Sequence, residues 1–442
     1  MASKKRNVVG TEYFTHEAQV LNLIEELKAS HGKKEYSDII DDEGHQYVDL
    51  VMEGGGVLGI ALVGYTYVLE EVGIRFLRIG GTSAGAINAA LLASLGKPEQ
   101  AKSEEILSHL ASVDMGSFVD SKDNDVQDFI RTILREPEQQ SWLQRKLPAG
   151  WFELAKGAQV LDSLNDDLGL NPGKAFYNWI KKILDKDGIK STAELKKRMA
   201  PPENLKARHP RKLRSGATNT RLALIAADIT TETKVEFPKM TSLYWKDENE
   251  VHPAHYVRAS MSVPGFFHPY RVKGIPQGDD ARKNWVQHAQ YTGNLPKECL
   301  FIDGGIMSNF PINLFHKPQF VPLTPTFGAR LGTDRLDPRD IASPFQMLGA
   351  IFDSARHTLD FDFISQNPDY KKLVTDIDPG DHHWLNFELS DEAKKDLFIR
   401  GAKAAYHFLI GFDWKNYKKI RKEIAKVCET EEEISRSKSS ES

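Results

Sequence analysis

The sequence predicts a three-layer α/β/α fold with a mostly parallel central sheet, a helical insertion and a helical C-terminal extension. Residues 47–95 read as β–loop–α–β–turn–α, which is the βαβ unit of a parallel sheet covered by helices. Strand-like apolar runs then return at 222–228 and 300–303, after a long stretch with helical periodicity. With 442 residues, 40% of them hydrophobic, the chain is long enough to bury a large core.

The first elements follow each other closely. Residues 1–46 are expected to form a helical extension, because apolar side chains recur at helical spacing within 17–29. Residues 47–52 are the first strand candidate, and a glycine-rich loop leads from them into an apolar helix that ends near Gly73. This order places the loop between a strand and the start of a helix.

The second strand candidate and the helix after it complete the unit. Residues 76–79 form the strand, and 86–95 form a strongly helix-forming segment that is closed by Gly96 and Pro98. The turn between them is rich in glycine. Both glycine-rich turns are therefore expected at the carboxyl ends of neighbouring parallel strands.

The middle of the chain, residues 101–215, predicts a helical insertion within a central domain that spans 47–320. Apolar residues share one helix face near 106–113, 126–133 and 176–183. Strand-like sequence resumes at 222–228, with a further candidate at 233–237.

The C-terminal part of the chain predicts more helices. Helical patterns at about 343–365 and 391–411 make residues 321–428 a helical C-terminal extension packed on the core. Residues 429–442 are rich in Glu and Ser with few apolar side chains, so this tail is expected to be disordered.

Composition excludes several classes of protein. The net charge of −4 does not suit a protein that binds polyelectrolytes. The two cysteines, Cys299 and Cys428, lie far apart and form no Cys-x-x-Cys pair, so a location in the reducing cytoplasm is expected. No paired Cys/His spacing or His-Glu-x-x-His motif predicts a metal site, and no cofactor is expected. The most apolar run, 57–69, is shorter than the roughly 20 residues of a membrane span. Any membrane contact is therefore expected to be peripheral.

A basic stretch lies between Lys174 and Arg214, with 13 Lys/Arg against four acidic residues. Such a run is typical of a solvated surface. It also suits docking on anionic lipid, where each close charge contributes about 1 kcal/mol. Few aromatic residues are interleaved with the charges, so no nucleic-acid partner is expected.

The first chemical signal is the loop Gly54-Gly55-Gly56-Val57-Leu58-Gly59. Glycines let the backbone approach a ligand closely, and the helix start adds partial positive charge. The loop therefore suits a phosphate or the oxyanion of acyl transfer. The alternatives are an ordinary strand-to-helix turn, or a nucleotide loop, which the glycine spacing and the missing Gly-Lys-Ser/Thr ending disfavour.

The second signal is Gly81-Thr82-Ser83-Ala84-Gly85, which matches G-x-S-x-G. Small neighbours permit the sharp strand-to-helix turn that presents a serine hydroxyl, and the helix start stabilises negative charge there. The alternative is a plain glycine turn in which the serine or threonine caps the helix.

The third signal is Asp303-Gly304-Gly305, at the end of the apolar run 300–303. Carboxyl ends of strands are where open α/β sheets place their active sites. Asp-Gly is also a common turn dipeptide, so this signal counts only in combination with Ser83.

In this order, the three motifs resemble those of the patatin-like phospholipases, over roughly residues 47–320. Two further segments are similar to the family's middle strand and to its Ala-Ser-x-x-x-Pro-x-x-Phe segment, namely 224–231 and 258–267. The resemblance implies a serine–aspartate dyad without histidine, with Ser83 as nucleophile and Asp303 as base. It also implies that Gly54, Gly55 and Gly56 supply the oxyanion hole. Further glycines support the motifs, namely Gly59, Gly81, Gly85, Gly304 and Gly305. The family usually has Arg or Lys just before the last glycine of the loop, where this chain has Leu58.

The function expected from this resemblance is a phospholipase A-type lipid acyl hydrolase that works through an acyl-enzyme on Ser83. Its expected partner is a phospholipid or other acyl ester at a membrane surface, and the oligomeric state is open. Alternatives are an acyltransferase or a general esterase on the same dyad, and a catalytically silent lipid-binding module. A Ser-His-Asp esterase would instead need one of the histidines that follow Asp303, which are His316, His357, His382, His383 and His407.

Overall fold

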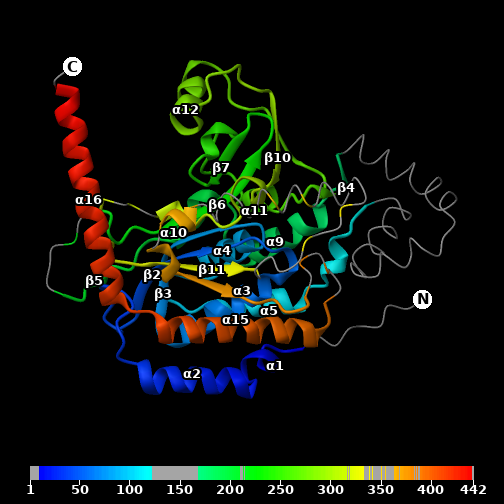
Figure 1. Ribbon diagram of the computed structural model, residues 1–442. Helices are drawn as coiled ribbons and strands as arrows, with labels where there is room; N and C mark the ends of the chain where they lie inside the picture. The colour runs from blue at the N-terminus through cyan, green and yellow to red at the C-terminus, as the bar shows by residue number, and fades with distance from the viewer. Residues whose placement is uncertain are drawn as a thin grey trace, which may run out of the picture.

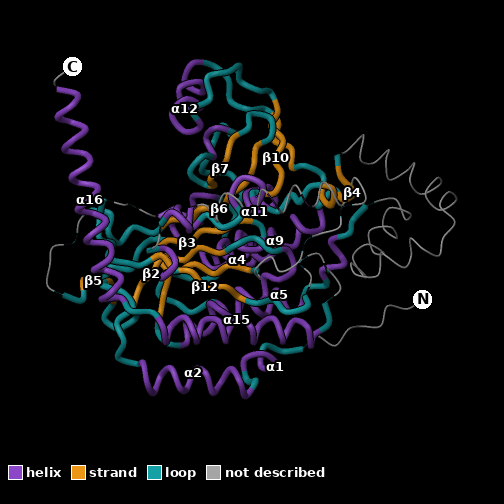
Figure 2. Tube along the Cα trace, in the orientation of Figure 1, coloured by secondary structure: helices purple, strands orange, loops and turns teal. Residues whose placement is uncertain are grey.

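The computed structural model describes residues 9–121 and 168–440, the second range with gaps between 210 and 214 and between 316 and 388, and side chains up to residue 428. Within these ranges a ten-stranded sheet has the order β12-β11-β2-β3-β6-β10-β9, with β7 on β6, β1 on β2 and β5 on β1 (Figures 1 and 2). Strands β4 and β8 pair separately. The strands are β1 Ile39–Ile40, β2 Gln46–Met52, β3 Ile74–Thr82, β4 Gly169–Asn171, β5 Lys206–Ala207, β6 Arg221–Asp228, β7 Thr233–Phe237, β8 Gly265–Phe267, β9 Tyr270–Lys273, β10 Glu298–Asp303, β11 Thr326–Leu331 and β12 Val374–Ile377.

The helices of the described residues pack around this sheet (Figure 1). The α-helices are α1 Glu12–Thr15, α2 Ala18–His31, α3 Gly59–Glu71, α4 Ala84–Ser94, α5 Ser103–Ser112, α9 Lys174–Lys186, α10 Thr192–Arg198, α11 Ala254–Ser260, α12 Asp279–Ala289, α13 Gly305–Ser308, α15 Asp391–Gly411 and α16 Trp414–Ser440. The 3-10 helices are η1 Gly56–Leu58, η2 Met115–Phe118, η3 Thr241–Leu243, η4 Ile312–Phe315 and η5 Tyr370–Lys372.

The sheet is mixed, so the prediction of a mostly parallel sheet is only partly confirmed. Strands β12, β11, β2, β3 and β6 run parallel to one another. Strands β10 and β7 run antiparallel to β6, β9 runs antiparallel to β10, and β1 runs antiparallel to β2 and β5. Only residues 229–232 join β6 to β7, and such a short link allows a hairpin but no crossover. Strand periodicity alone carries no information on strand direction.

Adjacent glycines in β3 show the layers on either side of the sheet, because successive residues of a strand face opposite sides. A Cβ atom at Gly80 would lie 2.7 Å from Cδ1 of Leu314 in η4. A Cβ atom at Gly81 would lie 2.5 Å from the carbonyl carbon of Gly85 in α4. Helix α4 and the turn η4 therefore cover opposite faces of β3.

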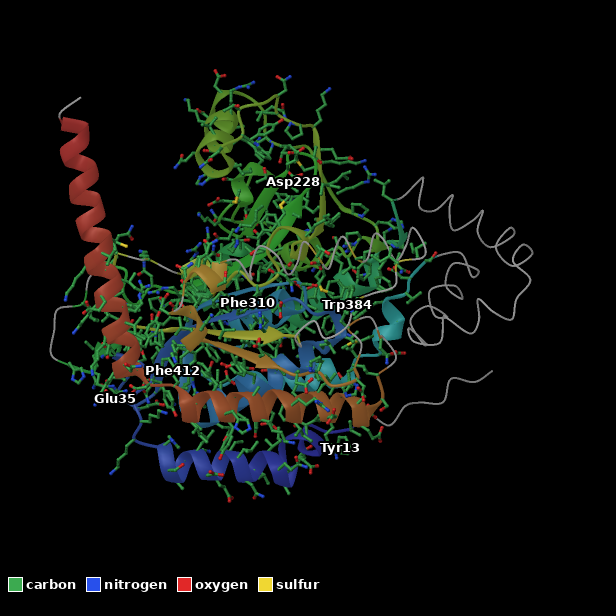
Figure 3. All side chains as sticks on the ribbon, viewed as in Figure 1. Tyr13, Glu35, Asp228, Phe310, Trp384 and Phe412 are labelled. Atoms are coloured by element: carbon green, nitrogen blue, oxygen red, sulfur yellow. The ribbon has the colours of Figure 1, made fainter. Side chains whose placement is uncertain are left out.

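Helix α15 packs closely on α3, and α2 lies outside α15 (Figures 1 and 2). A Cβ atom at Gly401 would lie 1.8 Å from the Ala61 carbonyl oxygen, so only glycine fits at this helix contact. At the end of α15, Phe408 and Phe412 pack edge-on against Phe327 of β11, with ring centroids 4.7 and 5.0 Å away. Figure 3 labels Phe412 at this junction. These contacts join the C-terminal part of the chain to the sheet.

The C-terminal part of the chain differs from the expectation in two ways. Residues 321–428, expected to be helical, also supply the strands β11 and β12, and α16 continues to Ser440 through the tail expected to be disordered. The helical patterns at 126–133 and over most of 343–365 lie outside the described residues. Within the described ranges, no helix combines the length and the apolar content needed to cross a bilayer.

Candidate active site

Ser83 sits on a strained turn between β3 and α4. Its backbone has φ 54° and ψ −119°, a conformation that is costly for a residue with a side chain. Glycine is required on both sides, because a Cβ atom at Gly85 would lie 2.2 Å from the Met52 carbonyl oxygen, and one at Gly81 would meet Gly85. The G-x-S-x-G pattern is thus explained by close backbone contacts, and it leaves Ser83 buried at the start of α4.

Asp303 is the last residue of β10, and its Cα pairs with Ala226 of β6. The side chain is buried, with 2% of its surface exposed, and its Oδ1 accepts a 2.8 Å hydrogen bond from the Gly305 N–H. A Cβ atom at Gly304 would lie 2.2 Å from the Ile225 carbonyl oxygen. The glycines after Asp303 therefore allow the turn to fold back against β6.

One short segment, Ser260 to Ser262 at the end of α11, contacts the backbone of both residues. The Ser83 N–H donates to Ser260 Oγ at 2.9 Å, and the Asp303 N–H donates to the Ser262 carbonyl oxygen at 2.8 Å. Ser260 Oγ in turn donates to the Ile225 carbonyl oxygen at 2.6 Å. The structure therefore brings Ser83 and Asp303, which are far apart in sequence, to the two ends of one three-residue support.

A buried guanidinium holds this support in place. Arg258 is 2% exposed and donates to Ser262 Oγ at 2.6 Å and to the carbonyl oxygens of Pro172 and His268 at 3.0 and 2.9 Å. Its guanidinium also lies 4.9 Å from the ring centroid of Phe267. Burial lowers the pKa of Arg258 to about 10, which leaves it charged at neutral pH.

The glycine-rich loop follows β2 and is held from two sides. The Gly54 N–H donates to the Asn309 carbonyl oxygen at 3.1 Å, and the Val57 N–H donates to the Trp384 carbonyl oxygen at 3.0 Å. Gly56 has φ +55°, and a Cβ atom there would lie 2.2 Å from the Trp384 oxygen. Among the described residues, the amides of Gly55 and Gly56 have no hydrogen-bond acceptor.

Two residues that support this loop, Asn309 and Glu53, lie outside the three motifs predicted from the sequence. Asn309 Nδ2 donates to Glu53 Oε1 at 2.9 Å and to the Gly54 carbonyl oxygen at 3.2 Å. The buried Glu53 carboxylate also accepts a 2.5 Å hydrogen bond from the Leu331 N–H of β11. The available signal was a polar Ser-Asn pair directly before Phe310-Pro311, soon after the Asp-Gly-Gly motif.

Gly59, the last glycine of the loop, lies at the start of α3, next to α4. Asn88 Nδ2 donates to the Gly59 and Ala84 carbonyl oxygens at 3.2 and 3.0 Å, which ties the two helix starts together. Leu58, at the position where the related family has a basic residue, is 5% exposed. It therefore lies in the core, away from any solvent-exposed headgroup contact.

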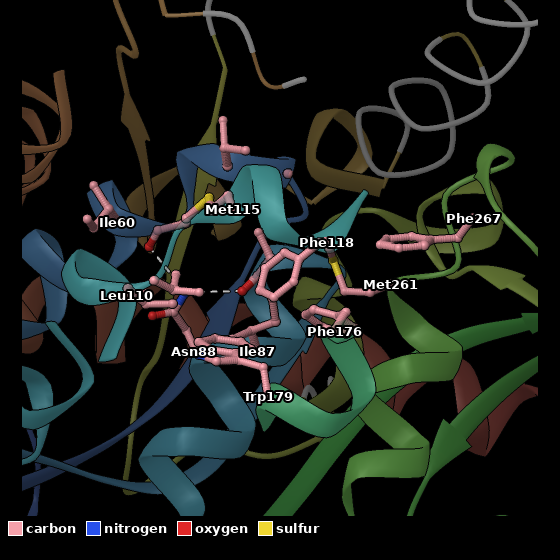
Figure 4. A pocket seen from close by; sticks show the side chains of 15 residues that line it. Ile60, Ile87, Asn88, Leu110, Met115, Phe118, Phe176, Trp179, Met261 and Phe267 are labelled. Atoms are coloured by element: carbon pink, nitrogen blue, oxygen red, sulfur yellow. Dashed lines mark hydrogen bonds between the residues drawn. The ribbon is translucent and has the colours of Figure 1, made fainter. Parts of the chain in front are cut away.

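An apolar pocket lies next to the nucleophile turn, because its lining includes Ala84, which follows Ser83, and Met261, which contacts Ser83 (Figure 4). In the view of Figure 4, Ile60, Leu110 and Met115 line one end, and Met261 and Phe267 line the other. Only two of the lining side chains carry a nitrogen or oxygen atom, namely Asn88 and Trp179. The NH₂ group of Asn88 already donates to backbone carbonyl oxygens. The lining residues are Gly56, Val57, Gly59, Ile60, Ala84, Ile87, Asn88, Leu110, Val113, Met115, Phe118, Phe176, Trp179, Met261 and Phe267.

The side-chain contact of Ser83 is with a methionine. Ser83 Oγ lies 3.1 Å from Met261 Sδ, and no described histidine contacts it. His382 is bonded instead to Asp396 at 2.9 Å, while His316, His357 and His383 lie outside the described residues. Over the part of the chain that the structure describes, no group of three or more His, Cys, Asp or Glu side chains could hold a metal ion.

Most of these elements lie in a region that matches a known protein family. The family model described as Patatin-like phospholipase matches residues 50–316, more than half of the chain. The chain belongs to the patatin-like phospholipase family. Membership assigns the fold, a mixed central sheet covered by helices, and it assigns a hydrolase of lipid esters at the level of the family.

Individual relatives of this patatin-like protein span different shares of it. It is 29% identical to the uncharacterized protein YqhO of Bacillus subtilis (strain 168) over 365 residues, which cover 82% of this chain and 98% of YqhO. A 46-residue stretch is 59% identical to lysophospholipase nte1 of Aspergillus terreus (strain NIH 2624 / FGSC A1156), covering 10% of this chain and 3% of that protein. The crystal structure of VipD from Legionella pneumophila matches with a TM-score of 0.40 and 16% identity, over 85% of this chain and 70% of VipD.

Proposed function

We propose that this patatin-like protein is a phospholipase A-type lipid acyl hydrolase, with Ser83 as nucleophile and Asp303 as the base. The observation that carries the proposal is the support shared by the two residues, since Ser260 binds the Ser83 backbone and Ser262 binds that of Asp303. Both side chains are buried, and Ser83 contacts Met261, which lines an apolar pocket. A buried serine and a buried carboxylate on one support, with an apolar cavity next to the serine, suit attack on the ester of a fatty acid.

The reaction begins when Ser83 Oγ attacks the ester carbonyl carbon and gives up its proton to the Asp303 carboxylate. Serine is a weak nucleophile at neutral pH, so its attack depends on this base. Collapse of the tetrahedral intermediate breaks the ester bond, and the leaving alcohol takes the proton from Asp303. Water then attacks the acyl-enzyme, again with Asp303 as base, and releases the fatty acid.

The oxyanion of each intermediate is proposed to bind the amides of Gly55 and Gly56. Among the described residues these amides have no acceptor, whereas the Gly54 N–H is used by Asn309. Of the three glycines expected to form the hole, Gly54 is therefore proposed to act through its contact with Asn309. The start of α4, directly after Ser83, adds a favourable dipole.

The pocket is proposed to bind the acyl chain. It is lined almost entirely by apolar side chains, and each CH₂ group buried there contributes about 0.8 kcal/mol. Three aromatic rings form a continuous wall, with Phe118 and Phe176 centroids 5.4 Å apart and Phe118 and Trp179 centroids 5.5 Å apart. Such a wall excludes water from the ester and favours a long hydrocarbon chain over a small acyl group.

The substrate is proposed to be presented by a membrane surface, through peripheral contact. Helix α9 places Phe176 and Trp179 in the pocket wall while Lys174, Lys182 and Lys186 are exposed on the same helix. These lysines suit the headgroups of anionic lipids, at about 1 kcal/mol per close charge. No cofactor takes part in the proposed reaction.

Fatty-acid release from phospholipid vesicles tests this function, with Ser83→Ala and Asp303→Asn as the altered proteins. We expect release by the unaltered protein and loss of at least about a hundredfold in each variant, because either change removes a participant in the acyl transfer. New esters formed when a lysolipid acceptor is added would instead identify an acyltransferase. Binding of vesicles without any release, by folded protein, would favour the silent lipid-binding module.

A further inference from the structure

Met261 contacts the proposed nucleophile and also lines the pocket. It caps the end of α11, is 5% exposed, and its Sδ lies 3.1 Å from Ser83 Oγ. It also lines the pocket together with Phe267 (Figure 4). A side chain in contact with the nucleophile must border the first atoms of any acyl group bound there.

The backbone of Met261 cannot move without disturbing the site. The Met261 N–H donates to the Val257 carbonyl oxygen at 3.0 Å, and the Met261 carbonyl oxygen accepts from the Val263 N–H at 2.9 Å. Its neighbours Ser260 and Ser262 hold the backbones of Ser83 and Asp303. The Met261 thioether is therefore carried on a backbone that is held next to Ser83.

The thioether fills the space next to the nucleophile. It is buried, and its sulfur is only a weak hydrogen-bond acceptor, so it borders a bound acyl group through packing and not through a strong polar contact. When Ser83 Oγ bonds to an ester carbon, the carbon next to that carbonyl comes within contact distance of the Met261 thioether. A straight chain needs room for one substituent at this carbon, whereas a branched chain needs room for two.

We propose that Met261 determines specificity at the carbon next to the ester carbonyl, admitting unbranched acyl chains and excluding branched ones. The proposal rests on the proposed function, because it assigns Ser83 as the atom that carries the acyl group. Met261→Ala removes three heavy atoms from the side of the pocket nearest Ser83 and leaves the backbone contacts in place. Met261→Leu is the matched control, since it keeps a similar volume while removing the sulfur.

The test compares kcat/KM for two esters of the same chromogenic alcohol, one straight and one with a methyl branch next to the carbonyl. One methylene group in an apolar pocket changes such a ratio by roughly ten- to two-hundredfold. We expect the unaltered protein and Met261→Leu to prefer the straight ester by at least about tenfold, and Met261→Ala to lose that preference. An unchanged preference in folded Met261→Ala would overturn the proposal, as would loss of the preference in Met261→Leu. If Met261→Ala does not fold, Met261→Val gives a smaller truncation with the same expected direction.

A second readout separates this proposal from the proposed function. The rate at which straight and branched alkyl fluorophosphonates label Ser83, followed by peptide mass spectrometry, gives the same preference without turnover. Labelling of Ser83 with a preference that Met261→Ala leaves unchanged would overturn the role of Met261 alone. Folded protein in which neither probe labels Ser83 would overturn both proposals.

Discussion

Gly56→Ala is expected to lower turnover by about a hundredfold while leaving the protein folded. Gly56 has φ +55°, and a Cβ atom there would lie 2.2 Å from the Trp384 carbonyl oxygen. Real Cβ contacts are no shorter than 3.0 Å, so the loop or the Trp384 carbonyl must shift by about 0.8 Å. The shift displaces the amides of Gly55 and Gly56, the proposed oxyanion donors.

The magnitude follows from two separate costs. A left-handed backbone costs alanine roughly 1–2 kcal/mol in stability. Misplacement of catalytic groups by about 1 Å costs about a hundredfold in rate. Because an oxyanion forms only in the transition state, the loss should appear in kcat more than in KM.

Gly44→Ala is the matched control for the backbone cost. Gly44 has φ +87° in the turn before β2, and a Cβ atom there would have nothing within 4 Å. Gly56→Ala should therefore lose at least as much free energy of unfolding in urea as Gly44→Ala, and only Gly56→Ala should lose kcat for a soluble ester. Full kcat in folded Gly56→Ala would contradict the assignment of these amides as oxyanion donors, as would an equal loss of kcat in Gly44→Ala.

Three further predictions concern the groups around the site. Asn309→Ala should lower kcat with little change in KM, because Glu53 and the Gly54 carbonyl lose their shared donor; unchanged kinetics would contradict this. Arg258→Met should lower the free energy of unfolding in urea by about 3 kcal/mol or more, because buried oxygens lose their donor, and a loss near zero would contradict this. Burial lowers the pKa of His255 to about 4, from 6.5 in the unfolded chain. The unfolded chain therefore binds the proton first, and the folded protein loses stability as the pH falls from 6.5 towards 4. The free energy of unfolding lost over this pH range is about 3 kcal/mol. His255→Gln should reduce the pH dependence of unfolding in urea, and identical pH profiles for the two proteins would contradict this prediction.

Residues whose roles depend on local chain geometry could be predicted from the sequence. Gly81 and Gly85 are required by close contacts within one strand–turn–helix unit, and this unit is what the G-x-S-x-G pattern encodes. Asp303 follows an apolar strand and precedes two glycines that fold back on β6. The apolar helices on either side of these turns lie close to their expected positions, as α3 and α4 show.

Residues that act across long sequence separations could not be predicted in the same way. Glu53 binds Asn309 and Leu331, which are 256 and 278 residues away, and no local pattern records such a pairing. The same applies to Trp384, which holds the glycine loop from outside the region that the family model covers. The direction of β10 also depends on its partner β6, whereas an apolar run of residues has no direction.

The rate at which a fluorophosphonate labels Ser83, compared between the unaltered protein and Asp303→Asn, tests the serine–aspartate pair most directly. This reaction needs the nucleophile and its base but no lipid, membrane or acyl pocket. We expect labelling of Ser83 in the unaltered protein and a rate lower by roughly a hundred- to ten-thousandfold in Asp303→Asn. Equal labelling rates in the two folded proteins would contradict the assignment of Asp303 as the base.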